Sequence, residues 1–376
     1  MNLGTILKVS ELNTFYKMKI FLISNLYPSK SDLDYGIFVR NIELELESLG
    51  ADIVHKSVIS GRAISLVDKI KKYKNFYSQI ISSYRKNNFD LVYLHFLSHS
   101  SPGLLIARTL FGKNRRFVIN VHGSDVLKYN KGVLKWCNNK LLKETDLLVV
   151  PSSYFKKIIN ETFPYFPTNK IYISPSGGID LSVFNHQVSK KNSFIHLGFI
   201  SRIEDDKGWK TFMKAIIQLK KRKISFKASI AGRGSKIEEL KAFIDKNNLS
   251  EQVKYLDILS HKELNVLYNE LDLFVFPTKS SESLGLVGLE AMACGVPVIG
   301  SQIAGLKTFI EDRKNGFFFP PGNEIELTER ILEFYSLSDQ EKNDMSEAAI
   351  KTAQNYDRKY VAAQLYQKFE QLLSKN

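Results

Sequence analysis

Short apolar runs alternate with longer amphipathic stretches along the whole chain. Runs of this length predict buried strands, and the amphipathic stretches predict helices. We expect strands at 18–24, 52–57, 91–95, 117–121, 147–151, 171–174, 194–200, 227–231, 253–256, 273–276, 298–301 and 316–319. Strand–helix alternation is typical of parallel sheets built from βαβ units. Because twelve strands in one sheet are unusual, two sheets in two domains are the better division.

The helices predicted in the front half span 39–49, 66–86, 103–110, 133–143 and 154–161, and a last helix spans 360–372. A hinge is expected at 175–180, where Pro175 precedes the consecutive glycines Gly177 and Gly178. We therefore divide the chain into an extension (1–17), an N-terminal domain (18–178), a C-terminal domain (179–355) and a helix (356–376) that packs back on the N-terminal domain. Met18 opens the first strand and is a candidate natural start.

The composition fits a globular protein of two domains, with 376 residues of which 44% are hydrophobic. The two cysteines, Cys137 and Cys294, have no paired spacing, which argues against a disulfide framework or a zinc site. No run of about 18 apolar residues is present. Residues 1–17 lack the apolar core of a signal peptide. A cytoplasmic protein is expected.

Positive charge is concentrated in the front of the chain, where residues 1–180 carry +11 of the net +14. Between Lys69 and Lys86, basic residues are interleaved with tyrosine, phenylalanine and isoleucine. This pattern suits a helix lying on an anionic membrane surface, peripheral on the cytoplasmic face. The alternative is a solvated basic helix that packs its apolar stripe on a sheet. No nucleic-acid-binding module is recognisable, so nucleic acid is not an expected partner.

The segment 280–299 carries the strongest chemical signal. A predicted strand leads into a loop with Glu282, and the helix that follows carries Glu290. In open α/β sheets, ligands bind at the carboxyl ends of strands, and helix amides favour anions there. A phosphate would rest on the amides around Gly285, Leu286 and Val287, and a carboxylate further along would bind ribose hydroxyls. The alternative is that Glu290 is an ordinary exposed helix residue with no role in binding.

A second signal lies at the end of the strand predicted at 194–200. Arg202 and Lys207 follow this strand, and Gly208 starts the next helix. Two cations at a strand's carboxyl end would clamp a diphosphate, the arginine bidentately and the lysine as a point charge. The alternative is a surface loop in which Lys207 pairs with Asp205 or Asp206. A Gly-x-Gly turn at Gly232 and Gly234 is a weaker sign, because glycines also serve ordinary turns.

Taken together, these residues resemble the family 4 glycosyltransferases, retaining enzymes of the GT-B fold. The resemblance covers nearly the whole chain from Met18, and the ordered set of motifs is specific where no single motif is. The matching segments are Tyr27-Pro28, Gly36-Ile37-Phe38-Val39, His122-Gly123-Ser124-Asp125, the hinge at 175–180, Gly198 to Gly208, the turn at 232–235, Pro277 to Val298, and 315–322. The resemblance implies an α/β chain with two Rossmann-like parallel α/β/α domains that face a central cleft.

The resemblance also implies roles for individual residues. Glu290 would hold the ribose, and Glu282 and His122 would bind hydroxyls of the donor sugar. Arg202 and Lys207 would neutralise the diphosphate, with amides near Gly36, Leu286 and Val287. Gly285 would open the donor-binding helix, and Gly234 and Ile258 would border the base. Asp125 would orient its loop. No metal or other cofactor is implied, and we interpret the Asp-x-Asp at Asp32 and Asp34 as a chance match.

The leading hypothesis is a hexosyltransferase that moves a sugar from a nucleotide-diphosphate sugar to a lipid-linked saccharide or glycolipid in cell-surface polysaccharide biosynthesis, such as capsule or lipopolysaccharide. The alternatives are a soluble transferase with a free or phosphorylated acceptor, and a non-catalytic partner subunit. Leu284 and Arg233 depart from the family pattern, which has phenylalanine and aspartate at these positions. The donor nucleotide (UDP, GDP or ADP), the sugar, the linkage and the oligomeric state are left open.

Overall fold

The computed structural model describes residues 17–33, 35–112, 115–127, 131–187 and 193–374. Within them the chain forms two compact units. The first comprises the described residues of Met1–Val150, Tyr165–Tyr172 and Ala362–Asn376, and the second those of Pro151–Pro164 and Ile173–Val361. The expected extension at 1–17 lies almost wholly outside the described residues. The domain limits expected from the sequence stay a prediction.

Each unit is built on a six-stranded parallel sheet, in the order β2-β1-β3-β4-β5-β6 in the first and β12-β11-β10-β7-β8-β9 in the second. The strands of the first sheet are β1 (Lys19–Tyr27), β2 (Asp52–Ser60), β3 (Leu91–His95), β4 (Arg116–Asn120), β5 (Leu147–Val150) and β6 (Ile171–Ile173). Those of the second are β7 (Ile195–Ile200), β8 (Phe226–Ala231), β9 (Val253–Tyr255), β10 (Leu273–Phe276), β11 (Val298–Ser301) and β12 (Gly316–Phe319). The predicted α/β class and its two Rossmann-like sheets are therefore confirmed.

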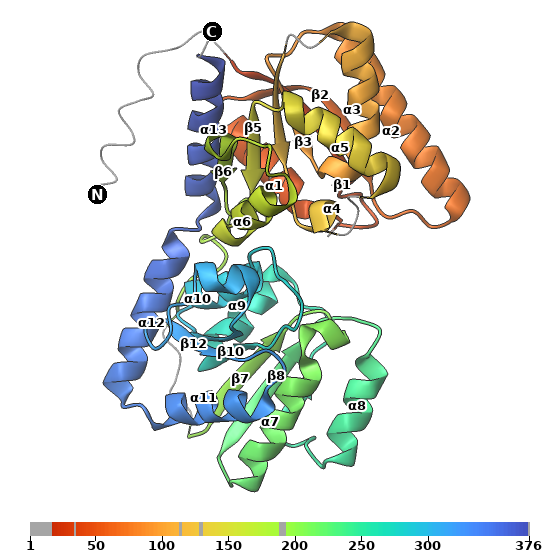
Figure 1. Cartoon of the computed structure of the whole chain (residues 1–376). Helices are drawn as coiled ribbons and strands as arrows, with labels where there is room; N and C mark the ends of the chain where they lie inside the picture. Colours follow the sequence, from red (N-terminus) through yellow and green to blue (C-terminus); the bar gives the residue numbers. More distant parts are fainter. Residues whose placement is uncertain (1–16, 34, 113–114, 128–130, 188–192, 375–376) are drawn as a thin grey trace. The chain divides into compact units, whose positions relative to one another are not determined.

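In the first unit, helices cover both faces of the sheet (Figure 1). On one face, Ile20 and Leu22 of β1 pack with α1 (Ile37–Ser48) and the last part of α13 (Arg358–Leu373), which contributes the buried Leu365 and Phe369. On the other, α2 (Leu66–Lys86) and α3 (Leu97–Phe111) lie side by side on the strands. The remaining helices are α4 (Ser124–Leu127) and α5 (Gly132–Glu144), which packs on α3.

Helix α3 begins six residues before the predicted start. A proline inside a helix removes a backbone donor and clashes with the preceding turn, which disfavours a helix that runs through Pro102. Pro102 lies inside α3, which starts after Phe96 in the left-handed region (φ 61°). Pro102 is the sixth residue of α3, past the amides that lack partners at any helix start, so its missing donor costs the carbonyl of Ser98 its usual helical bond. The hydroxyl of Ser101 donates to that carbonyl at 2.9 Å instead.

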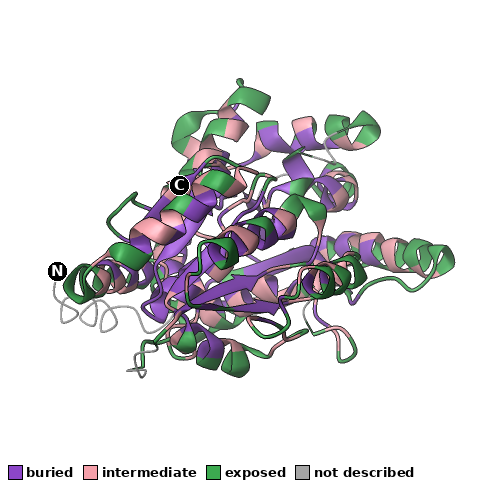
Figure 2. Ribbon diagram, turned by 90° about the horizontal axis from the view of Figure 1, so that it is seen from below, coloured by how far each residue is buried: buried purple, intermediate pink, exposed green. Residues whose placement is uncertain are grey.

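In the second unit, alternate strand residues face two layers of helices, as the period of two along a strand requires. Leu197 and Phe199 of β7 share a core with α7 (Trp209–Lys221), α8 (Ile237–Lys246) and α11 (Glu324–Ser336). Phe274 and Phe276 of β10 share the other core with α9 (His261–Glu270), α10 (Leu286–Ala293) and α12 (Asp339–Gln354). Helix α6 (Ser153–Thr162) also belongs to this unit. Figure 2 shows the strands buried and the outer faces of the helices exposed.

Among the described residues, no helix combines the length and the apolar character needed to cross a bilayer.

Candidate active site

The predicted donor residues of the second unit gather at one edge of its sheet. Strand β7 is central, with β8 on one side and β10 on the other, and the three run parallel. The loops that follow them therefore leave from the same edge. The strand order reverses direction between β7 and β10, and such a switch point is where open α/β sheets bind ligands. Arg202 and Lys207 follow β7, Gly234 follows β8, and Glu282 follows β10.

Glycines allow these loops to approach one another. Gly208 caps the start of α7 with φ 77°, and a Cβ there would lie 1.8 Å from the carbonyl oxygen of Pro277 at the end of β10. At Gly234, a Cβ would lie 2.2 Å from the carbonyl oxygen of Ile203. Larger residues would push the loops apart. Gly208 and Gly234 thus set how closely the loops after β7, β8 and β10 approach one another.

Lys207 and Glu282 form an ion pair with Nζ and Oε1 2.5 Å apart, and their side chains are 13% and 17% exposed. Glu282 also accepts a hydrogen bond from Thr278 Oγ1 at 3.1 Å. The alternative, in which Lys207 pairs with Asp205 or Asp206, is not seen: Asp205 pairs with Lys210, and Asp206 accepts a hydrogen bond from Ser280 Oγ at 3.1 Å. The ammonium is thus held in place at the edge of the sheet.

The loop that carries Glu282 is fixed by its backbone. The carbonyl of Glu282 accepts the amide of Gly305 at 3.0 Å, and the carbonyl of Ser283 accepts Ser152 Oγ at 2.8 Å. Ser152 is the N-cap of α6, more than one hundred residues earlier in the chain. Sequence reasoning missed Ser152, since a serine before a helix signals only a cap.

Arg202 is exposed, and no ion pair to it is found within the described part of the chain. The site therefore offers one cation in an ion pair, Lys207, and one, Arg202, whose charge lowers the pKa of the nearby Glu204 but which forms no ion pair within 4 Å among the described residues. A guanidinium with free donors can bind two phosphate oxygens at once, whereas an ammonium acts as a point charge. The pair fits the predicted diphosphate clamp in number and in chemical type.

Helix α10 begins at Leu286, directly after Gly285 with φ 100°. The first amides of a helix have no partner inside it, and the helix dipole adds partial positive charge at this end. The amides of Leu286 and Val287 are therefore available to an anion at the same edge of the sheet as Lys207. This is the arrangement that the sequence predicted for a bound phosphate.

Glu290 lies one turn further along α10 and is not an ordinary exposed helix residue. One of its oxygens accepts a hydrogen bond from the hydroxyl of Tyr268 in α9 at 3.3 Å. Burial raises the pKa of Glu290 to about 7, against a weaker lowering effect of the Tyr268 hydrogen bond. A carboxylate with so few donors has acceptor capacity left for the two hydroxyls of a ribose. The sequence could not reveal Tyr268 as its partner.

At the end of β8, Arg233 occupies the turn position where the family has aspartate. Its Nε lies 2.8 Å from Asp257 Oδ1, and both side chains are exposed. Asp257 also accepts the amide of Ile258 at 2.8 Å. Ile258 is 51% exposed and so presents an apolar surface next to this pair. The turn after β8 thus presents one apolar and one charged group to solvent, and their place beside a nucleotide base stays a prediction.

In the first unit, His122 follows β4 and lies against the start of α1. Its ring centroid is 4.8 Å from that of Phe38 and 4.4 Å from that of Phe96. Its Nε2 is 3.0 Å from Nδ1 of His95, a buried residue at the end of β3 that the sequence did not single out. Burial lowers the pKa of His122 to about 3, so the ring is neutral at physiological pH.

Asp125 holds the loop around His122. Its Oδ1 accepts the amides of His122 and Gly123 at 3.1 and 2.9 Å, and its Oδ2 accepts the amide of Leu97 at 3.0 Å. Gly36, the N-cap of α1, has φ 74°, and a Cβ there would lie 2.5 Å from the carbonyl carbon of Leu26. Glycine thus lets the start of α1 approach the end of β1.

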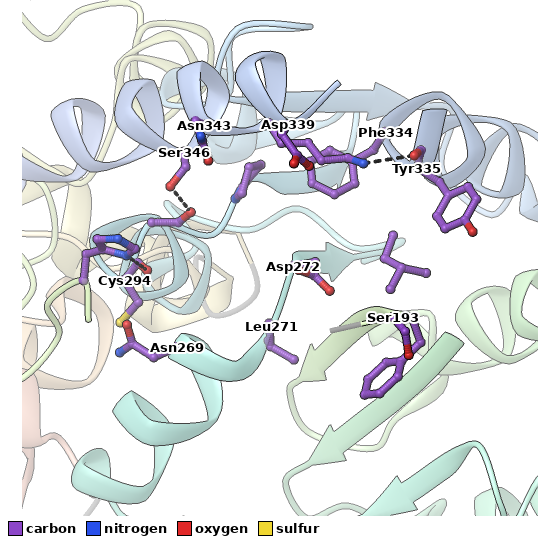
Figure 3. A pocket seen from close by; sticks show the side chains of 16 residues that line it. Ser193, Asn269, Leu271, Asp272, Cys294, Phe334, Tyr335, Asp339, Asn343 and Ser346 are labelled. Carbon is purple, nitrogen blue, oxygen red and sulfur yellow. Dashed lines mark hydrogen bonds between the residues drawn. The ribbon is translucent and has the colours of Figure 1, made fainter. Parts of the chain in front are cut away.

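A cavity of about 650 Å³ lies at the opposite edge of the second sheet. Figure 3 shows its lining, which includes Leu271 and Asp272 before β10 and Cys294 after α10. None of the predicted site residues lines it. It sits at the amino ends of the strands, where the loops that carry the site residues do not reach.

Within the described residues, no group of three or more His, Cys, Asp and Glu side chains is placed to hold a metal ion. Asp32, from the Asp-x-Asp match, instead accepts Arg62 NH1 at 2.7 Å and the Arg62 amide at 2.9 Å. Asp34 lies outside the described residues. Metal independence stays a prediction.

Both parts of the chain match known families. Residues 184–352 match the family described as "Glycosyl transferases group 1", and residues 58–182 match "Glycosyltransferase Family 4". An uncharacterized glycosyltransferase of Methanocaldococcus jannaschii is 24% identical over 84% of this chain and 88% of its own length. The putative colanic acid biosynthesis glycosyltransferase WcaL of Salmonella typhimurium is 25% identical over 53% of this chain. That alignment spans only half of WcaL.

Among solved structures, Anabaena HepE in complex with UDP and glucose has a TM-score of 0.69 and 17% identity. The alignment covers 95% of this chain and all of HepE. At this identity the likeness shows the fold. The two family matches follow one another along the chain and together cover most of it. This agrees with the two Rossmann-like sheets. The chain belongs to the family 4 glycosyltransferases and has the GT-B fold.

Proposed function

We propose that this glycosyltransferase moves a sugar, with retention of configuration, from a nucleotide-diphosphate sugar to a hydroxyl of a lipid-linked saccharide or glycolipid. The observation that carries the donor half is the set of groups at the switch point between β7 and β10. Two cations, a helix start and a half-buried carboxylate lie at one edge of one sheet. Each group matches one part of a nucleotide-diphosphate sugar.

The diphosphate would bind Arg202, Lys207 and the amides of Leu286 and Val287. The nucleoside's ribose would bind Glu290, with its base beside Ile258. Glu282 would turn one oxygen to a sugar hydroxyl while it keeps Lys207 in position. HepE, which shares the fold, was solved with UDP and glucose, and this supports a donor of the same kind.

The proposed chemistry needs no nucleophilic side chain. The bond between the anomeric carbon and the phosphate oxygen breaks, and the acceptor oxygen bonds to the same face of that carbon. The acceptor's proton passes to the leaving phosphate oxygen. Fixed cations and amides stabilise the negative charge that develops on the diphosphate. Without a metal, Arg202 and Lys207 would supply this charge. We assign His122 to a sugar hydroxyl, since a neutral imidazole can both donate and accept a hydrogen bond.

The acceptor half is supported by the surface of α2. Its apolar stripe, Phe76, Ile80 and Tyr84, is buried on the sheet, as the plain alternative required. The segment at the start of the helix is different, because its large apolar side chains face solvent. These are Ile64 (94% exposed), Leu66 (74%), Val67 (76%) and Ile70 (62%).

Basic residues surround this apolar tip, with Lys69, Lys71 and Lys74 on the same helix. Exposed apolar side chains next to lysines are typical of a protein surface that binds an anionic bilayer. We therefore place the enzyme on the cytoplasmic face of the membrane, with the tip of α2 in the interface. The relation to WcaL, whose name assigns it to colanic acid biosynthesis, supports a role in surface polysaccharide assembly.

A soluble transferase that acts on a free or phosphorylated acceptor is the second candidate. This candidate has the same donor site as the leading proposal, but in it the start of α2 does not bind a membrane. A non-catalytic partner is disfavoured by the intact Lys207–Glu282 pair and by Glu290.

The donor assignment is tested by calorimetric titration with UDP, GDP and ADP, followed by transfer assays with sugars of the nucleotide that binds. We expect one nucleotide to bind, and Glu290→Ala to weaken it at least about tenfold, as the loss of hydrogen bonds to a charged group predicts. Glu347→Ala, at an exposed glutamate of α12, is the matched control. If no nucleotide binds, or if both variants bind it as the wild type does, the assignment is wrong.

A further inference from the structure

The first unit has a cavity of about 390 Å³ at the carboxyl edge of its sheet. The cavity lies at the end of β1 and the start of α3, with Asn25 and Leu26 on one side and Phe96 and His99 on the other. Strand order in this sheet reverses direction between β1 and β3. The cavity therefore occupies the switch point of the first sheet, where a ligand is expected on topological grounds. Its volume suits a small ligand.

Three cations line this cavity, Arg62, Lys69 and Lys72, all from the connection between β2 and α2 or from α2 itself. Two are held in place by the protein. Arg62 pairs with Asp32 at 2.7 Å, and Lys72 Nζ donates to the carbonyls of Ser60, Gly61 and Arg62 at 3.0–3.1 Å. Lys69, in contrast, has no acidic partner among the residues that the structure describes.

The acid in the lining does not neutralise these cations. Asp125 is directed to the backbone, where its two oxygens accept the amides of His122, Gly123 and Leu97. The positive field in the cavity acts on His99, whose pKa is lowered by burial first and by the charge of Lys69 second. Asp32 offsets the charge of Arg62, and Asp68 lies 3.8 Å from the ammonium of Lys72, so the positive charge left over for an anion in the cavity is that of Lys69.

One buried polar group in the cavity has no partner. Asn25 is 7% exposed, and its Oδ1 accepts no hydrogen bond from any described residue. Its Nδ2 is 3.5 Å from the Tyr73 hydroxyl, and its carbonyl is 3.5 Å from the Tyr35 hydroxyl, both at the limit of a hydrogen bond. Buried acceptors are nearly always satisfied in proteins, so a ligand donor is expected at Asn25. A sugar hydroxyl is such a donor.

We propose that this cavity binds a phosphorylated sugar of the acceptor, with Lys69 and Arg62 on the phosphate and Asn25 on a sugar hydroxyl. The inference rests on the proposed function, because it names the chemical class of the acceptor. The phosphate belongs either to a lipid-linked sugar or to a free sugar phosphate, and both present the same group to Lys69. The apolar tip of α2 follows Arg62 directly in the chain, which favours the lipid-linked form.

The test is calorimetric titration of the full chain with glucose 1-phosphate and, for comparison, glucose. We expect glucose 1-phosphate to bind at least about tenfold more tightly than glucose, as a charge-assisted bond predicts. Lys69→Gln should remove this difference, and Lys69→Glu should abolish binding of the phosphate. Both variants should fold, because Lys69 is exposed. Lys71→Gln is the matched control, an exposed lysine on the same helix that does not line the cavity.

A second arm uses glucose linked through phosphate to a prenyl chain, in neutral detergent micelles. Tighter binding of this compound than of glucose 1-phosphate, lost in Ile64→Ser with Leu66→Ser, assigns the lipid-linked source. Equal binding of the two assigns the free sugar phosphate, and in both cases Lys69 is required.

UDP binding, measured on the same variants, separates this inference from the proposed function. If UDP, GDP and ADP all fail to bind, the proposed donor site is wrong whatever the cavity binds. If a nucleotide binds but Lys69→Gln binds glucose 1-phosphate as tightly as the wild type, the inference about the cavity is overturned alone. Equal affinity of the wild type for glucose and glucose 1-phosphate overturns it too.

Discussion

At the scale of single residues, the most informative group is Glu290, whose carboxyl is buried against Tyr268 and has a pKa raised to about 7. Its protonated form accepts hydrogen bonds from ribose hydroxyls more weakly, because the charge that strengthens these bonds is lost. An acid with a raised pKa is ionised above that pKa, so nucleotide affinity should be full above pH 8 and fall as the pH drops through 7. His122, with a pKa of about 3, does not change its charge in this range.

We predict that the dissociation constant of the bound nucleotide rises about tenfold for each pH unit below 7 in the wild type. In Glu290→Gln the affinity should be lower and this part of the pH dependence absent. Calorimetry between pH 5.5 and 8.5 measures both. Comparison with the variant removes the contribution of the nucleotide's own phosphate. An identical slope in the variant would show that another group titrates.

The ion pair of Lys207 and Glu282 leads to a second prediction. Lys207→Ala should weaken nucleotide binding and transfer at least about tenfold, because it removes a cation and leaves the carboxylate of Glu282 beside the diphosphate. The double variant Lys207→Ala with Glu282→Gln should bind the nucleotide more tightly than Lys207→Ala alone, since the repulsion is gone. Lys351→Ala, at an exposed position on α12, is the control. Additive effects of the two changes would contradict a direct coupling.

At the scale of elements, α2 has a buried side and an exposed apolar start. The helix was predicted from its period at 66–86, the range that it occupies. The period did not show that Ile64, Leu66 and Val67 face solvent, because an apolar residue at the start of an amphipathic helix is normally counted with its core. The first buried side chain of the helix is that of Phe76.

Replacing Ile64, Leu66 and Val67 together by serine should reduce sedimentation with vesicles that contain phosphatidylglycerol by at least about tenfold, since each buried aliphatic side chain contributes about 1.5–3 kcal/mol. High salt should release the wild type, because the lysines act through screened charge. Val133→Ser, at a side chain 74% exposed on α5, is the control. Nucleotide affinity should not change. No binding of the wild type at any salt concentration would contradict the membrane assignment.

At the scale of the whole molecule, most of the last helix, α13, packs in the first unit although it follows the second unit in the chain. Phe369 of α13 is fully buried with β1 and β3, and its ring centroid is 5.1 Å from that of Tyr93. The donor residues Arg202, Lys207, Glu282 and Glu290 all belong to the second unit. Stability of the first unit and nucleotide binding by the second should therefore respond differently to substitutions in α13.

Phe369→Ala should lower the free energy of unfolding of the first unit by about 3–5 kcal/mol, the usual cost of removing a buried aromatic ring. Chemical denaturation followed by tyrosine fluorescence measures this cost. Calorimetry under native conditions should give an unchanged nucleotide affinity. Gln371→Ala, an exposed position on the same helix, is the control. A loss of stability below about 1 kcal/mol would show that the helix is not part of this core.

The fold could be predicted almost completely from the chain. Each of the twelve expected strands is present, because short apolar runs bounded by turn residues can bury themselves only in a sheet with helices on both faces. The predicted start of α3 was wrong by six residues, since the helix begins after Phe96 in a left-handed conformation and runs through a proline. Helix boundaries depend on single caps that propensity does not determine.

For the proposed site, the sequence by itself predicted the candidate residues Arg202, Lys207, Glu282, Glu290 and His122, from their places after strands or in the helix that follows and from the resemblance of the motifs. Only the tertiary structure decided their partners: Glu282 for Lys207, Tyr268 for Glu290, and His95 for His122. It also decided that Asn25, Lys69 and Arg62 line one cavity. The reason is physical, because local periodicity reports which residues are buried, whereas pairing and pKa depend on groups brought together from distant parts of the chain.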